Sequence, residues 1–152
     1  MPLAFLLTLL LAPPPDAFTR LQSLAGDWEA KNARGSVVRV NYRLVANDSA
    51  LVETWRTPSG RETLTIYHPD GARLLLTHYC AQGNQPRLAL TKSAGDELTF
   101  TFVDATNLAS AGASHLVRAT LHFDGVNAFD KSETYANDGK EETEVLHFRR
   151  AQ

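Results

Sequence analysis

The feature that most constrains the fold is a long series of short β-type segments with almost nothing helical between them. From residue 26 to residue 149, runs rich in Val, Thr, Leu, Phe and Tyr alternate with Gly, Asp, Asn and Ser. The links between the runs are nearly all short enough for hairpins, which predicts an antiparallel meander. We predict ten strands, over residues 26–32, 36–46, 50–57, 62–68, 72–80, 87–92, 97–103, 114–123, 128–136 and 140–149.

Turn residues punctuate the meander. Asp70-Gly71, Gly95-Asp96 and Asp138-Gly139 favour the positive φ of tight hairpin turns. One longer link, residues 104–113, is rich in Ala and Ser, and we expect a mobile loop there. An open sheet of ten strands would leave two exposed edges, and closure removes them. The sequence therefore predicts an all-β fold, a single antiparallel up-and-down β-barrel of about ten strands, with a two-sheet sandwich as the alternative.

The N-terminal segment has a different character. Leu3 to Ala12 is an apolar run that carries one Thr, and it is too short to span a bilayer. This length is typical of a secretory signal peptide, and Ala12 and Ala17 offer cleavage points. No Lys or Arg precedes the run, so a misassigned start or a buried N-terminal helix is the alternative. We predict a signal peptide at 1–17, a barrel domain at 18–152 that begins with a short helical turn, and export to the periplasm or outside the cell.

Charge and cysteine content exclude several classes of partner. The formal net charge is −2 with mixed signs along the chain, which argues against nucleic acid and anionic membranes. No later segment is apolar enough to predict a transmembrane span. Cys80 is the only cysteine, so no internal disulfide can form, and a free thiol in an exported chain is expected to be buried. We expect a monomer.

Gly26-Asp27-Trp28, after the short helical turn, resembles the Gly-x-Trp signature of lipocalins and related calycins. The resemblance implies that Trp28 closes one barrel end and packs against a basic residue of the last strand. Arg149 or Arg150 could fill that role, and Arg149 is the predicted partner. Ten strands look more like fatty-acid-binding proteins or nitrobindin than eight-stranded lipocalins. Ala30 stands where nitrobindin has a second Gly, so no cofactor is predicted, and haem is kept as a minor alternative.

A second resemblance rests on residues 77–87, Thr-His-Tyr-Cys-Ala-Gln-Gly-Asn-Gln-Pro-Arg, preceded by Thr-Ile-Tyr-His-Pro-Asp-Gly at 65–71. This pair of segments is similar to the signature of a group of exported bacterial proteins. The resemblance implies a lipocalin-like barrel in the bacterial envelope and no established activity.

The hairpin around Asp70-Gly71 supplies the first candidate site residues. A two-residue turn there places Thr63 opposite His78, and the two-residue period of a strand puts His78 and Cys80 on one face. One interpretation is a semi-polar cavity lined by Thr63, Thr65, Tyr67, His78 and Cys80. The other turns His78 outward, because the opposite face of the hairpin is the more apolar. We favour the inward interpretation, since it hides the thiol.

The next hairpin points to Arg87. A turn at Ala94-Gly95 or at Gly95-Asp96 puts Arg87 on the face of Phe100, the most apolar in the chain, and so predicts that Arg87 enters the barrel. By analogy with fatty-acid-binding barrels, Arg87, His78 and Tyr67 would hold a carboxylate or phosphate. The alternative places Arg87 at the strand mouth, paired with a loop carbonyl or Asp104. Asn84 and Gln85 are further ligand candidates, unless they only satisfy loop backbone groups.

These residues predict an exported protein that binds a small apolar or amphipathic molecule, lipid-like or carboxylate-bearing. A non-catalytic structural or interaction barrel with a filled interior is the main alternative, and a haem- or metal-binding barrel is a lesser one. His78 and Cys80 have a spacing that can begin a metal site, but no third ligand is evident, so no metal is assigned. No third group orients them for catalysis either, so an enzyme is not predicted.

Overall fold

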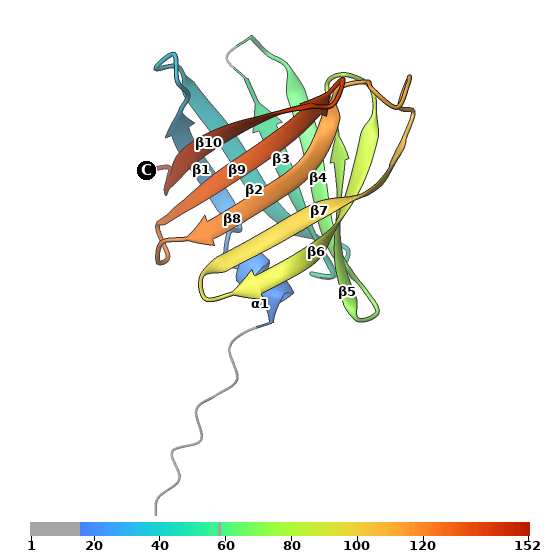
Figure 1. Ribbon diagram of the computed structural model, residues 1–152. Coiled ribbons are helices and arrows are strands. Elements are labelled where there is room, and N and C mark those ends of the chain that lie inside the picture. Colours follow the sequence, from blue (N-terminus) through green and yellow to red (C-terminus); the bar gives the residue numbers. More distant parts are fainter. Residues whose placement is uncertain (1–15, 58) are drawn as a thin grey trace, which may run out of the picture.

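The computed structural model describes residues 16–57 and 59–152, and the predicted leader therefore lies, except for Asp16 and Ala17, outside the described residues. One short helix precedes the strands (Figure 1). All ten predicted strands are present, with small shifts at their ends. The elements are α1 (Ala17–Gln22), β1 (Gly26–Lys31), β2 (Val37–Val45), β3 (Ala50–Arg56), β4 (Glu62–Asp70), β5 (Arg73–Tyr79), β6 (Gln85–Ala94), β7 (Glu97–Thr106), β8 (His115–Phe123), β9 (Ala128–Asn137) and β10 (Lys140–Arg150).

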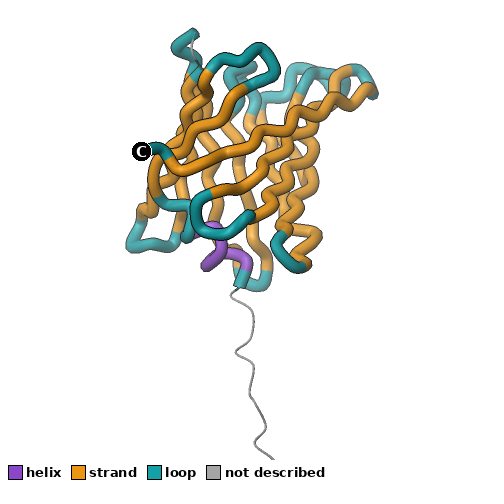
Figure 2. The backbone as a smooth tube through the Cα atoms, turned by 90° about the vertical axis from the view of Figure 1, so that its left-hand side faces the viewer, coloured by secondary structure: helices purple, strands orange, loops and turns teal. Residues whose placement is uncertain are grey.

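The sheet closes on itself. Each strand pairs antiparallel with the next in sequence, and β1 pairs with β10, so the order is that of an up-and-down barrel (Figures 1 and 2). The predicted barrel is confirmed, and the sandwich alternative is wrong. Closure gives every strand two neighbours, which satisfies backbone groups that an open sheet would expose.

The pairing between strands is uneven. β9 and β10 share ten residue pairs, from Lys140↔Asn137 to Arg149↔Ala128, whereas β1 and β10 share two, Trp28↔Arg150 and Glu29↔Arg149. The register shifts at two points between β6 and β7 and at one point between β8 and β9. Such bulges change which face of the barrel a side chain occupies.

Helix α1 covers one end of the barrel (Figure 1). Asp16 caps it, because its Oδ1 accepts a hydrogen bond from the Thr19 backbone N–H at 2.8 Å. Leu21 is fully buried, and the Arg20 guanidinium donates to the Gly95 carbonyl in the β6–β7 turn. Cleavage after Ala17 stays a prediction, and it would remove this cap. The end of the barrel that carries the β3–β4, β5–β6 and β9–β10 connections lies away from the helix, and we call it the open end.

Trp28 and Arg150 fasten the helix end to the barrel. The Trp28 indole N–H donates to the Leu24 carbonyl at 2.7 Å, and the Arg150 guanidinium lies 4.4 Å from the centre of the indole ring. Arg150 also donates to the carbonyls of Ser23, Ala25 and Val126 at 2.9–3.1 Å. The prediction that Arg149 packs against Trp28 is wrong, because Arg150 fills that place. Arg149 is the cross-strand partner of Glu29 and lies on the exposed outer face.

The conformation and surroundings of Gly26 explain why the Gly-x-Trp motif begins with glycine. Its φ of 126° lies in the left-handed region that favours glycine, and a Cβ at this position would lie 2.8 Å from the Arg150 guanidinium. The motif therefore keeps the space that the capping arginine occupies.

Aromatic side chains fill the interior above the helix. The rings of Phe129 and Phe148 stack at 5.0 Å, and the edges of Trp28 and Tyr42 meet Phe129 at 4.8 and 5.9 Å. Tyr67 and Phe100 form a further edge contact at 5.8 Å. The half of the barrel next to α1 is thus an apolar core.

Candidate functional site

Three charged side chains lie in the middle of the barrel. The Lys131 ammonium, 2% exposed, bonds to the carboxylates of Glu53 and Glu133, the second at 2.8 Å. Glu53 is equally buried, and Glu133 keeps 18% of its side-chain surface. Burial of ions is costly unless they are paired, and here one ammonium serves two carboxylates.

Strand alternation places these charges inside. Glu53 lies between Leu51 and Trp55 on the inner face of β3, and Leu51 is fully buried. Lys131 and Glu133 follow Phe129 at two-residue steps on β9, and Phe129 is fully buried as well. On both β3 and β9, a buried apolar residue near α1 sets which side chains of the strand point into the barrel. The charged residues follow on the same inner face, closer to the open end.

Two tyrosines surround Glu53. The Tyr67 hydroxyl donates to Glu53 Oε2 at 2.8 Å. Tyr42 is the direct cross-strand partner of Glu53, yet its buried hydroxyl has no hydrogen-bond partner among the described residues. Burial, and then the Glu53 carboxylate, raise the pKa of both phenols well above the usual value. Both therefore stay protonated and able to donate.

His78 joins the cluster from β5. Its Nδ1 lies 3.0 Å from the Thr65 hydroxyl and its Nε2 3.2 Å from the Tyr135 hydroxyl. His78 is buried, as the inward interpretation of the hairpin requires, but its cross-strand partner is Thr65 and not Thr63. The turn is displaced by one residue along the chain, which moves the register by two and keeps the face. Burial lowers the pKa of His78, which favours a neutral ring near pH 7.

The cluster carries a net negative charge. Burial opposes ionisation of Glu133, but the Lys131 ammonium, joined at acid pH by protonated His78, outweighs it, and the pKa of Glu133 is lowered. Burial likewise opposes the charge on Lys131, but Glu133 and Glu53 outweigh it and raise its pKa. With His78 neutral, two carboxylates face one ammonium.

The acidic character continues to the open end along β10. Glu144 is the direct cross-strand partner of Glu133, and Glu142 is the partner of Tyr135. A space of about 10 Å³ lies between Trp55, Lys131, Glu133, Glu144 and Leu146. A second space of about 140 Å³ adjoins Ser114, Tyr135, Asn137, Lys140 and Glu142. Glu144 has no ion pair among the residues that the structure describes.

Arg87 is not part of this interior site. Its side chain is half exposed and forms a two-pronged pair with Asp104, one arm of which, from Nε, is 2.6 Å long. The prediction that Arg87 enters the barrel is wrong, and the alternative of a pair with Asp104 is confirmed. A bulge at Thr91 makes Leu90 the partner of Phe100, so Leu88 and Leu90 face inward and Arg87 faces outward.

The other predicted ligand residues are spread over the open end. Thr63 is half-buried on β4, and Cys80 is half-buried rather than fully hidden, with a pKa that burial raises. The Asn84 amide donates to the Ser114 carbonyl at 2.9 Å. The Gln85 amide donates to the Gly83 carbonyl and accepts from Thr106. Asn84 and Gln85 therefore bind loop and strand groups, as their alternative interpretation expects.

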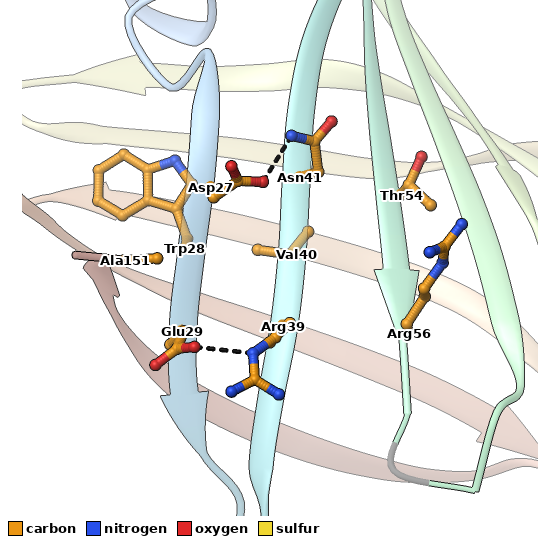
Figure 3. A pocket seen from close by; sticks show the side chains of 9 residues that line it. All are labelled: Asp27, Trp28, Glu29, Arg39, Val40, Asn41, Thr54, Arg56 and Ala151. Atoms are coloured by element: carbon orange, nitrogen blue, oxygen red, sulfur yellow. Dashed lines mark hydrogen bonds and ion pairs between the residues drawn. The ribbon is translucent and has the colours of Figure 1, made fainter.

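Larger grooves lie on the outer wall of the barrel. One of about 540 Å³ crosses β1, β2 and β3, and its polar side chains bond to one another: Asn41 to Asp27, and Arg39 to Glu29 (Figure 3). Another of about 360 Å³ includes Arg87 and Tyr79. The arginines that line these two grooves are already paired: Arg39 with Glu29, Arg56 with Glu62, and Arg87 with Asp104.

His78 is not placed as a haem ligand. Both ring nitrogens of His78 have hydrogen-bond partners, so this histidine offers no free nitrogen to a haem iron, and we derive no haem chemistry. Within residues 16–57 and 59–152 no group of three or more His, Cys, Asp or Glu side chains is arranged to hold a metal ion. No helix in the same ranges has the length and apolar character needed to cross a bilayer.

Sequence reasoning missed Glu53, Lys131 and Glu133. The signal for Glu53 was present, because Leu51 and Trp55 on either side of it are apolar and share its face. The signal on β9 was weak, since both of its faces mix polar and apolar residues.

The fold and site define a closed antiparallel β-barrel with an aromatic core at one end and a buried, net-acidic cluster that leads to the other. No protein-family model and no curated protein matches the sequence. Among solved structures, EF1p2_mFAP2b bound to DFHBI is 11% identical with a TM-score of 0.38, covering 88% of this chain and 98% of that one. A redesigned β-barrel, b11L5F_LGL, is 12% identical with a TM-score of 0.35, covering 86% and 93%. Scores this low carry no argument about ligand or function.

Proposed function

We propose that the protein binds a small amphipathic molecule through the open end of the barrel. The observation that carries the proposal is the buried polar cluster around Lys131, which adjoins space bordered by Trp55, Glu144 and Leu146. Buried charges lower stability compared with apolar side chains of the same size, so a role in binding explains their presence. Small-molecule sites of this kind combine an apolar wall with a few convergent polar groups.

The position of Arg87 changes the expected chemistry of the ligand. The sequence predicted an anionic head group, because it placed Arg87 inside the barrel. Arg87 is instead paired with Asp104 on the outer wall. Inside, the Lys131 ammonium already bonds to two carboxylates. An interior anion would therefore meet an acidic surface.

Native mass spectrometry of the purified protein, with solvent extraction of whatever co-purifies, tests the proposal. We expect a defined small-molecule adduct that is lost in a Trp55→Ala variant, because Trp55 forms the apolar wall of the space. A Val145→Ala variant is the control, since Val145 is half exposed on the outer face of β10. An adduct equally abundant in both variants would contradict binding at this site.

A second candidate is a barrel without a ligand, whose filled interior only supports the outer wall. The water-sized volume of the space beside Lys131 favours it. The two candidates differ in one measurement: a screen of small amphiphiles by nuclear magnetic resonance shifts the Trp55 indole signal only if the open end binds them.

We further propose that the chain is exported. Its support is the apolar run at Leu3–Ala12 and the small residues that follow. Expression in a bacterial host, fractionation, and the intact mass of the recovered protein test this and locate the cleavage point. Retention of the full mass in the cytosol would contradict it.

A further inference from the structure

We infer that residues 140–147 of β10, here called the β10 edge, bind an extended basic peptide of another protein as an added strand. The inference concerns a macromolecular partner and does not depend on the small-molecule binding proposed above. It starts from the incomplete pairing of the strands that close the barrel. β10 pairs with β9 from Lys140 to Arg149, whereas its register with β1 covers Arg149 and Arg150.

The β10 edge has a neighbouring strand on one side. Within residues 16–57 and 59–152, no strand pairs with residues 140–148 on the side that faces β1. The two strands meet near the C-terminus and separate toward the open end (Figure 1). The barrel is therefore closed by a short seam, beyond which β10 has an edge without a strand.

The backbone of the β10 edge directs hydrogen-bonding groups to this side. The Ala151 N–H donates to the Asp27 carbonyl of β1 at 2.9 Å. Successive residues of an antiparallel strand direct their backbone groups to alternate sides, so the odd-numbered residues of β10 point the same way as Ala151. The N–H and C=O groups of Thr143, Val145 and His147 thus face the side without a strand. Such a row of groups is a template for a strand from another chain.

Solvent exposure shows that this side is open. Leu146 and Phe148 point into the barrel and are 4% and 1% exposed. Glu142 and Glu144 lie on the same face of β10, yet both are exposed, as is every residue from 140 to 145. A strand covered on both sides would hide the residues of its inner face, so the exposure of this face is independent evidence of a free edge.

A groove follows the seam between the two strands. It has a volume of about 670 Å³, with Lys31 and Val37 on one side and His147 and Arg149 on the other. Val37 is 37% exposed and offers an apolar contact to a chain that enters the groove. The space beside the β10 edge is thus accessible from the outer wall of the barrel.

The side chains of the β10 edge determine which peptide fits. Glu142 and Glu144 have no ion pair among the residues that the structure describes. They lie two positions apart on one face, so an added strand with Lys or Arg at every second position places a cation opposite each carboxylate. Opposite charges across a strand pair stabilise it, and like charges destabilise it.

Two occupants from this protein itself fit less well. Residues 1–15 contain no Lys or Arg, and three successive prolines at positions 13–15 lack the N–H groups that strand pairing needs. The β10 edge of a second copy contains three Glu and one Lys, so pairing of the two acidic stretches brings like charges together. Charge complementarity therefore assigns the edge to a basic segment of another protein.

Two eight-residue peptides test the inference, one alternating Lys with Thr and the other alternating Glu with Thr. Each is added to the purified protein, and amide hydrogen exchange is followed by nuclear magnetic resonance. We expect the Lys peptide to bind at least tenfold more tightly than the Glu peptide. It should slow exchange of the Thr143, Val145 and His147 N–H groups, because these groups point to the added strand. A Lys peptide with every backbone nitrogen methylated should not bind, since it keeps the charge and loses the donors.

A matched pair of variants tests the same edge from the protein side. Val145→Pro removes an N–H that faces away from β9, and edge strands tolerate proline at such positions. We expect the affinity for the Lys peptide to fall at least fivefold in this variant. Val145→Ala is the control, because it keeps the N–H, and its affinity should equal that of the wild type.

Several outcomes would overturn the inference: equal affinity for the Lys and Glu peptides, binding of neither, binding without slower exchange at the β10 edge, or undiminished binding of the methylated peptide. The methylated peptide is tested on the wild-type protein, so the result stands even if Val145→Pro does not fold. Slower exchange of the same N–H groups at high protein concentration without peptide would assign the edge to a second copy, and would also overturn it.

Discussion

Lys131 is the residue on which the polar interior depends. Its ammonium bonds to both Glu53 and Glu133, and removal of one member of a buried ion network leaves the other charges uncompensated. Lys140, at the start of β10, is exposed and lies opposite Asn137 rather than in the cluster.

Replacement of Lys131 by Met, which keeps an unbranched side chain of similar length and removes its charge, should lower the free energy of unfolding by about 3–5 kcal/mol. Lys140→Met should change it by less than about 0.5 kcal/mol, as is usual for exposed positions. Urea denaturation of both variants measures the difference. Equal denaturation midpoints would show that the burial of Glu53 and Glu133 does not require the Lys131 ammonium.

Arg150 is the second residue with a disproportionate role. It stacks on Trp28 and donates to three backbone carbonyls, whereas Arg149 is exposed on the outer face. We expect Arg150→Ala to lower the free energy of unfolding by about 2 kcal/mol, since hydrogen bonds from charged groups are among the stronger ones. Arg149→Ala should be close to neutral, and thermal unfolding of the pair checks the assignment. A larger loss in Arg149→Ala would reverse it.

Among the elements, α1 is short and depends on its cap. A six-residue helix is not stable by itself, so the Asp16 cap and the packing of Leu21 hold it in place. In the uncleaved chain, which retains Asp16, Asp16→Ala should cost about 1 kcal/mol of unfolding free energy. Asp124→Ala, an exposed control whose side chain forms no hydrogen bond among the described residues, should change little. A neutral Asp16→Ala would mean that the helix end does not need its cap.

The strands also show how far the sequence could predict this fold. Alternation, turn residues and link lengths suffice for ten strands and their order, because each depends on residues close together in the chain. Bulges depend on the fit between neighbouring strands, and one bulge at Thr91 was enough to turn Arg87 from the inside to the outside. His78 was placed correctly since its hairpin has no bulge.

The site was harder to predict than the fold. Glu53, Lys131 and Glu133 are bonded across the barrel, over 78 residues of sequence in the case of Glu53 and Lys131. No local pattern shows that an inward charge has a partner on a distant strand. A rule that assigns charged residues to the outer face therefore fails for the residues that matter most.

For the molecule as a whole, the buried cluster predicts sensitivity to acid. Burial holds the pKa of His78 below its unfolded value, so the unfolded chain binds the extra proton first and stability falls as the pH drops below about 6.5. The pKa of Glu133 is also lowered, so its contribution is present above its unfolded pKa and is lost as the pH falls further.

Chemical denaturation between pH 8 and about pH 3 should show both steps, since the Glu133 step begins only below about pH 4.3. The first should be absent from a His78→Gln variant, which cannot take up the proton, while the second remains. A wild-type profile that is flat from pH 8 to pH 5 would contradict the assigned role of His78.

The two residue pairs between β1 and β10 have a consequence for the order in which the molecule assembles. Arg150 donates to the Ser23 carbonyl across 127 positions of the chain, so the closing contact has nearly the largest sequence separation that the chain allows. Contacts of that kind form slowly, because the loop entropy must be lost before they contribute. A ribosome must therefore release almost the whole chain before the first strand finds its final neighbour, and until then the molecule is an open sheet with two free edges.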